Sequence, residues 1–142
     1  MVARVLLVTV MVSVSASLHA QSYAVQVWNQ LQRAYSDISD SSSFVLNNYI
    51  IGKLADGATD TWTFPLERGK EYLIIGVCDN DCADVDLAVK DDSGGLVVRD
   101  EEVDDTPVTR FRVISSGRFT VEVGMADCRD EPCFFGFGLF EK

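Results

Sequence analysis

The residues best suited to chemistry stand in one short acidic segment, Cys78-Asp79-Asn80-Asp81-Cys82-Ala83-Asp84-Val85-Asp86. It carries four carboxylates and one amide within nine residues. Calcium binds six to eight hard oxygen ligands of this kind, so the candidate metal ligands are Asp79, Asp81, Asp84 and Asp86. The segment is not an EF-hand loop, because the sixth position from Asp79 is not glycine and the twelfth is Lys90. A solvated acidic turn is the alternative interpretation.

The chain has four cysteines, Cys78, Cys82, Cys128 and Cys133. An even number of cysteines in an exported chain predicts two disulfide bonds. Of the three connectivities, we favour the local one, Cys78 with Cys82 and Cys128 with Cys133, while pairing between the two loops stays open. A zinc site of four cysteines is the alternative, because the spacings are close to those of zinc ligands. An oxidising compartment favours disulfides.

The N-terminus has the parts of a secretory signal peptide. Arg4 precedes an apolar run over residues 5–12, and small residues follow up to Ala20. Cleavage after Ala20 makes residues 1–20 the signal peptide, and cleavage after Ser17 is the alternative. The apolar run is too short to cross a bilayer. We expect an exported protein, periplasmic or extracellular, that is not inserted in a membrane after cleavage.

Cleavage also limits the possible chemistry. The only histidine, His19, lies in the signal peptide. The mature chain then lacks Ser-His-Asp and Cys-His catalysis and any zinc site that uses imidazole. Two carboxylates suffice for a glycosidase, but they need a cleft, which a small compact domain is not expected to have. We therefore expect no enzyme, and a small secreted hydrolase is the less favoured alternative.

The charge of the chain bears on its partners. Twelve Lys and Arg residues face 22 Asp and Glu, a formal net charge of −10, and the loss of Arg4 makes it −11. Nucleic acid and anionic lipid are poor partners for so acidic a protein. The mature length of about 122 residues suits one domain whose core requires no metal. No cofactor is required, and calcium is the only one the acidic segment suggests.

One amphipathic stripe precedes the strands. Within residues 22–38, apolar side chains recur at intervals of three and four, namely Val25, Trp28, Leu31, Tyr35 and Ile38. This period predicts a short N-terminal helix that packs on its own domain, and a helix that binds a partner is the alternative. A Ser-rich linker is predicted over residues 39–43. Residues 21–43 are thus helix and linker, and residues 44–142 form the domain.

From residue 44 onward the apolar period changes to two. Turn signals divide the chain into about eight short strands, each with one apolar face. This pattern predicts an all-β fold, an antiparallel β-sandwich with its core between two sheets. The side chains expected to face that core are Trp62, Phe64, Leu66, Leu73, Ile75, Val77, Val85, Leu87, Val89, Thr109, Phe111, Val113, Phe119, Val121, Val123, Met125, Phe135, Phe137 and Leu139.

The two cysteine-bearing loops are expected at the same end of the sandwich, because they follow strands four apart in an alternating order. Loops gathered at one end of a rigid sandwich are a usual place for binding. The candidate binding residues at this end are Asp79, Asp81, Arg129, Asp130 and Glu131, with Asp84, Met125 and Asp127 beside them. The second acidic run, residues 100–105, is expected to be a solvated loop.

Six segments, in their order and spacing, carry a family resemblance: Gly52-Lys53-Leu54, Asp60-Thr61-Trp62-Thr63-Phe64, Arg68-Gly69-Lys70-Glu71-Tyr72, Asp84-Val85-Asp86-Leu87, Asp91-Asp92-Ser93-Gly94 and Ser116-Gly117-Arg118-Phe119-Thr120-Val121-Glu122-Val123. Over roughly residues 48–141 the chain resembles the bacterial pre-peptidase C-terminal (PPC) domain. The resemblance implies a jelly-roll-like β-sandwich that serves as an accessory domain, usually of a secreted peptidase. Some members of that family bind collagen or polysaccharide, and some hold calcium through acidic loop residues. This sequence carries no peptidase, and its cysteine loops depart from the general family pattern.

We therefore expect a non-catalytic exported binding or accessory module of the bacterial envelope or secretome, whose partner is an unidentified protein or polysaccharide. A calcium-stabilised structural or adhesive domain is the alternative.

Overall fold

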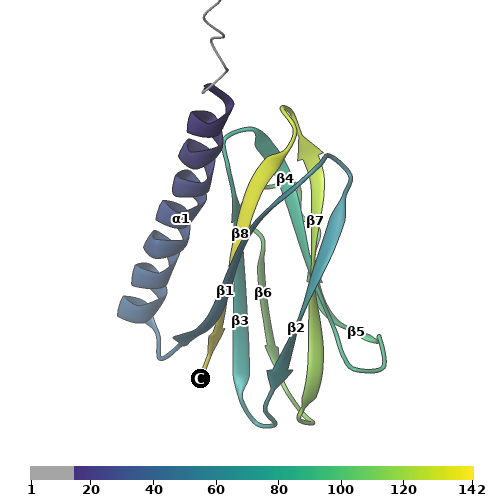
Figure 1. Ribbon diagram of the computed structural model, residues 1–142. Coiled ribbons are helices and arrows are strands. Elements are labelled where there is room, and N and C mark those ends of the chain that lie inside the picture. Colours follow the sequence, from purple (N-terminus) through teal and green to yellow (C-terminus); the bar gives the residue numbers. More distant parts are fainter. Residues whose placement is uncertain (1–14) are drawn as a thin grey trace, which may run out of the picture.

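One helix and eight strands make up the computed structural model, which describes residues 15–142, with side chains from residue 22 onward. The predicted signal peptide, residues 1–20, lies largely outside the described residues. In chain order (Figure 1) the elements are α1 (Ser15–Ser41), β1 (Val45–Leu54), β2 (Thr59–Leu66), β3 (Glu71–Cys78), β4 (Cys82–Lys90), β5 (Leu96–Asp100), β6 (Val108–Arg112), β7 (Gly117–Cys128) and β8 (Cys133–Glu141).

The strands form two four-stranded antiparallel sheets. The helix-side sheet has the order β1-β8-β3-β6, and the open sheet has the order β2-β7-β4-β5. In both sheets the neighbours in space are mostly distant in sequence, which is the strand order of a jelly roll. The predicted all-β sandwich preceded by an N-terminal helix is confirmed.

The main core lies between the two sheets. Val85, Leu87 and Val89 of β4 are buried there, as are the alternate residues of β7 from Phe119 to Met125. Burying one face of each strand removes the apolar set from water while the polar set stays solvated, which is why a period of two identifies these strands. Phe135 and Phe137 of β8 fill the centre, and both rings contact Trp62 of β2 at 5.6 Å between centroids.

The prediction for β3 is wrong in its choice of face. The predicted core residues Leu73, Ile75 and Val77 point away from the other sheet and pack against the helix. Tyr72 and Ile74 face the main core instead. β3 is covered on both faces, by the open sheet on one side and by α1 on the other, so it is largely apolar and its alternation does not identify the inner face.

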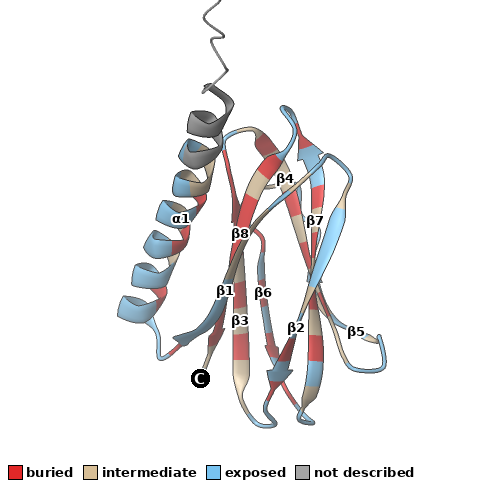
Figure 2. Cartoon of the chain, viewed as in Figure 1, coloured by how far each residue is buried: buried red, intermediate tan, exposed pale blue. Residues whose placement is uncertain are grey.

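Helix α1 lies along the outer face of this sheet, next to β8, β3 and β1 (Figure 2). Val27, Leu31 and Ile38 are its buried side chains. The predicted stripe is therefore partly wrong, because Val25, Trp28 and Tyr35 are exposed. A helix that packs on a sheet buries only a narrow line of residues. The positions that flank this line in a broader apolar stripe therefore remain exposed to solvent. Among the described residues, no helix has the length and apolarity needed to cross a membrane.

The helix is longer than predicted and extends into the predicted Ser-rich linker. The Ser41 hydroxyl donates a hydrogen bond to the Asp37 carbonyl, and the Ser42 hydroxyl donates one to the Ile38 carbonyl, at 2.7 Å. Serine side chains that bond back to the preceding turn satisfy carbonyls at the helix end. These contacts, together with buried Ile38, hold the last turn that the composition predicts as linker.

Candidate functional site

The two cysteine-bearing loops meet at one end of the sandwich, the disulfide end, as their strand order predicts. Cys78 is bonded to Cys82 and Cys128 to Cys133, which is the local pairing favoured by the sequence. The loops touch each other, because the Arg129 amide donates to the Asp81 carbonyl at 2.9 Å. Two disulfides in a domain of this size fit an oxidising, exported location.

Asp79 is the buried centre of the disulfide end, with only 2% of its surface exposed. One carboxylate oxygen accepts hydrogen bonds from the amides of Asp81 and Cys82, at 3.1 and 3.2 Å. The other accepts one from the Phe134 amide at 2.8 Å. Asp79 therefore joins the β3–β4 loop to the first residues of β8, and its carboxylate is occupied by the main chain.

Two of the other candidate calcium ligands lie on strand β4. Asp84 and Asp86 are alternate residues on the outer face of β4, where one Asp84 oxygen is buried without a hydrogen-bond partner. Burial, and then the charges of Asp84, Glu101 and Asp100, raise the pKa of Asp86. Within residues 15–142 as described, no three or more acidic, cysteine or histidine side chains are arranged to hold a metal ion. The structure does not bring the four aspartates together into one ligand set.

Asp81 faces the N-terminal half of α1. It accepts a hydrogen bond from the Tyr23 hydroxyl, and this bond together with the Asp81 charge raises the pKa of Tyr23. The Tyr23 ring lies 6.3 Å from that of Phe134, and the Gln30 amide donates to the Cys78 carbonyl at 2.8 Å. These contacts fix the position of α1 relative to the disulfide end.

The remaining candidates at this end divide by exposure. Arg129, Asp130 and Glu131 are exposed on the β7–β8 loop, and Asp127 is exposed near the end of β7. Met125 is 1% exposed and belongs to the main core, as its place in the alternation of β7 predicts, so it adds nothing to the surface of the disulfide end. β7 continues past Met125 to Cys128, where the β7–β8 loop begins.

An apolar hollow lies elsewhere, between α1 and the strands β1 and β8. This aromatic groove has a volume of about 230 Å³ and is lined by Trp28, Leu31, Gln32, Tyr35, Leu46, Tyr49, Gly138 and Phe140. None of these eight side chains is charged. The lining residues of α1 form one wall, those of β1 the other, and those of β8 the floor.

Two pairs of aromatic rings line the groove. Trp28 and Tyr35 are seven residues apart, which places them on one side of α1, two turns from each other. The ring centroids of Trp28 and of Tyr49 on β1 are 5.4 Å apart, and the two rings are tilted by 51°. The ring centroids of Tyr35 and of Phe140 on β8 are 6.4 Å apart, and the rings are stacked with an interplanar angle of 17°. Trp28, Tyr35 and Tyr49 remain 38%, 42% and 47% exposed.

The floor of the groove depends on a glycine. A Cβ at Gly138 would come within 2.8 Å of the Phe140 ring, so this ring lies against bare backbone. Gly138 pairs with Tyr49 across the β1–β8 ladder, and Phe140 pairs with Leu46. The ladder thus sets the residues of the floor beside the residues of the β1 wall.

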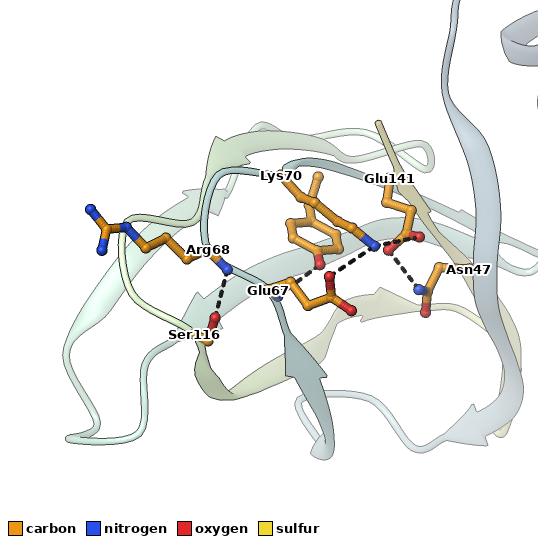
Figure 3. Close-up of polar contacts among 7 residues, drawn as sticks. Asn47, Glu67, Arg68, Lys70, Ser116 and Glu141 are labelled. Carbon is orange, nitrogen blue, oxygen red and sulfur yellow. Dashed lines mark hydrogen bonds and ion pairs between the residues drawn. The ribbon is translucent and has the colours of Figure 1, made fainter.

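Polar contacts anchor the β1 wall at the start of the strand (Figure 3). The Asn47 amide donates to one oxygen of Glu141 at 2.8 Å, and Lys70 holds the other oxygen at 3.1 Å. Lys70 also contacts Glu67 at 3.3 Å. The contacts of Asn47 and Lys70 with Glu141 together tie β1 to the end of β8 and to the β2–β3 turn, next to groove residues Leu46 and Phe140.

The groove was not predicted from the sequence. Trp28 and Tyr35 belong to the helical stripe, and the stripe assigns them to packing on the domain. Tyr49 stands at the start of a predicted strand with no sign of its exposure. The available signal is the width of the stripe, because a helix with more apolar positions than one narrow line can bury leaves aromatic rings outside.

No model of a known protein family matches the sequence, and no curated protein matches it either.

Proposed function

We propose that the protein is a non-catalytic exported binding module and that the aromatic groove is its binding site. The observation that carries the proposal is the exposure of Trp28, Tyr35 and Tyr49 around one hollow. Large apolar side chains gathered around a concave surface mark a place where a ligand or partner removes them from water. The rings sit on a helix and a strand that many contacts hold in place, so the site is preformed.

Several properties of the chain support this function over catalysis. The mature chain expected after signal cleavage has no histidine, and the lining of the groove includes no carboxylate, lysine or cysteine. The disulfides suit a periplasmic or extracellular protein, and the resemblance to the PPC domain suits an accessory role. The partner class is a protein or polysaccharide of that compartment, or a smaller molecule derived from one.

The test is a binding screen with matched variants. The wild-type protein, a Trp28→Ala/Tyr49→Ala variant and an Ile114→Ala control are applied to panels of glycans, envelope and matrix proteins, and small metabolites. Ile114 is 85% exposed and lies outside the groove. We expect at least one partner whose affinity falls at least about tenfold in the double variant and is unchanged in the control.

The disulfide end provides the competing site. An Arg129→Ala/Asp130→Ala variant changes two exposed loop residues while leaving the groove intact. Binding that is lost in this variant and kept in the groove variant would refute the groove as the site. Equal binding by all the variants would have the same consequence.

A further inference from the structure

We infer that the groove binds a quaternary ammonium group, carried by a soluble cation of the choline type. This inference rests on the proposed function of the groove. It follows from three properties: the aromatic, uncharged lining of the groove in an acidic protein, the small number of hydrogen-bond acceptors in that lining, and the size of the groove.

The field in the groove favours a cation. Aromatic rings carry negative charge on their faces and attract cations placed within about 6 Å of the ring centre. Trp28 packs against Tyr49, Tyr35 stacks on the buried Phe140, and the exposed parts of Trp28, Tyr35 and Tyr49 border the groove. No lysine or arginine lines the groove, and the whole chain carries a formal net charge of −10. Anionic ligands are disfavoured by the same charge.

The polar lining selects among cations. A lysine ammonium brings three N–H donors and an arginine guanidinium five, and each donor needs an acceptor when it leaves water. The groove offers only the Gln32 amide and the tyrosine hydroxyls, with no carboxylate among its eight lining residues. A trimethylammonium group has no N–H donor, so the apolar walls cost it little. A sugar has several hydroxyl donors, and like the guanidinium it finds too few hydrogen-bond acceptors in the groove.

The dimensions suit one small headgroup. Two helical turns separate Trp28 from Tyr35, a rise of about 10 Å along α1. The volume of about 230 Å³ is below the usual range for drug-sized ligands, so the groove does not hold a long chain. A phosphocholine lipid would bring its phosphate close to an acidic protein. A soluble cation such as choline avoids that repulsion.

The first experiment compares choline with its uncharged isostere, 3,3-dimethylbutan-1-ol, by isothermal titration calorimetry on the mature protein. The two molecules share a shape, and only choline carries the positive charge. We expect choline to bind about tenfold more tightly, as a cation over several partly desolvated rings should. Ethanolamine, whose ammonium has three N–H donors, should bind more weakly than choline. Saturating choline should also raise the melting temperature.

The second experiment uses variants that keep apolar volume and remove an aromatic face. Trp28→Leu and Tyr49→Leu should each weaken choline binding about five- to tenfold, while binding of the isostere changes little. The Ile114→Ala control should leave both affinities unchanged. Both rings are partly exposed, so the variants are expected to fold, and circular dichroism of each variant verifies this.

The outcomes separate this inference from the proposed function. Equal affinity for choline and the isostere, or binding of glycans in the groove without choline, would overturn the quaternary ammonium inference and leave the binding module standing. Tighter binding to phosphatidylcholine vesicles than to choline would overturn the soluble ligand. If neither choline nor any glycan, protein or metabolite of the screen binds the groove, both proposals are refuted.

Discussion

At the scale of single residues, the buried carboxylate of Asp79 is the part of the disulfide end whose removal should cost most. It accepts hydrogen bonds from three main-chain amides, those of Asp81, Cys82 and Phe134. Asp79→Ala leaves these donors without a partner and should lower the free energy of unfolding by about 3 kcal/mol. Urea unfolding followed by fluorescence measures the change.

Two further variants interpret that result. Asp79→Asn keeps one acceptor oxygen and should cost less than Asp79→Ala. Asp130→Ala changes an exposed carboxylate of the neighbouring loop and should stay within about 0.5 kcal/mol of wild type. A loss for Asp79→Ala no greater than for Asp130→Ala would show that the carboxylate does not hold the loops together.

The contribution of Asp86 to the stability of the folded protein should become less favourable as the pH rises. Burial first, and then the charges of Asp84, Glu101 and Asp100, raise its pKa above the ordinary value of 3.8. The folded state therefore holds the proton more tightly than the unfolded state. Stability falls as the pH rises from 3.8 through the folded-state pKa. Asp86→Asn should thus melt at a higher temperature than wild type at about pH 7, with the difference vanishing near pH 2.5.

Glu71 supplies a control of opposite sign. A hydrogen bond from Arg110, and then one from Lys142, lowers the pKa of Glu71 below its ordinary value of 4.5. Its contribution is present above that value and is lost as the pH falls through the lower folded-state pKa. Glu71→Gln should lower the melting temperature at neutral pH and approach wild type in acid. If both variants changed the melting temperature at neutral pH in the same direction, the direction of the pKa shift assigned to Asp86 or to Glu71 would be wrong.

The residue types alone identify these carboxylates as possible ligands, but they do not show which structural role each one has. Asp79, Asp81, Asp84 and Asp86 have the chemistry of calcium ligands, and their spacing gives no sign that Asp79 is enclosed by amides. Two of those amides, of Asp81 and Cys82, are local, and the third belongs to Phe134, which is 55 residues away along the chain. A contact of such sequence separation follows from the topology of the sheets and is invisible in a local motif.

At the scale of elements, the packing of α1 on the helix-side sheet depends on a glycine in β8. A Cβ at Gly136 would come within 2.8 Å of both Leu31 and Val27, and within 3.1 Å of the Ile50 carbonyl. Gly136→Ala should push the helix away from the sheet and lower the free energy of unfolding by about 1–3 kcal/mol. Chemical denaturation measures the loss.

The matched control is another strand glycine with open space around it. No atom of the described residues lies within 4 Å of a Cβ built on Gly117, at the start of β7, outside its neighbours in the chain. Gly117→Ala should therefore be nearly neutral. If the two variants have equal stability, close packing of the helix does not require Gly136.

The helix and the strands are largely predictable from the sequence. Which face of each element is buried against its neighbours is less predictable. Strands β4 and β7 follow from alternation because each has one apolar and one polar face. β3 is apolar on both faces, and its sequence contains no signal for which face meets α1. In β8, glycines alternate with larger apolar residues, and the predicted residues Phe135, Phe137 and Leu139 do face the main core. Likewise, the helical period predicts α1, but only the sheet decides that Val27 is buried and Val25 exposed.

At the scale of the whole molecule, the chain forms three layers, in which α1 covers one sheet of the sandwich and the other sheet faces solvent (Figure 2). The helix buries an apolar surface that the jelly roll leaves open, formed by Leu73, Ile75, Val77, Phe134 and Phe140. It also supplies half of the aromatic groove. The helix is thus both a structural layer and part of the proposed site.

A protein that lacks the helix tests this layering. A variant starting at Phe44 keeps all eight strands and both disulfides. We expect it to keep the circular dichroism of a β-sandwich, to melt at a lower temperature, and to self-associate with rising concentration. The reason is that apolar surface covered in the full protein becomes a contiguous exposed patch. Size-exclusion chromatography with light scattering follows the association.

The same variant with polar replacements on the uncovered face separates the patch from other effects of truncation. Val77 and Phe134 point toward the helix and away from the core between the sheets, so Val77→Thr and Phe134→Thr should restore a monomer without disturbing that core. In the full-length protein the same two changes should destabilise, because they lie against Val27 and Leu31. A truncated protein that is monomeric and as stable as the full chain would show that the helix is not a layer of the fold.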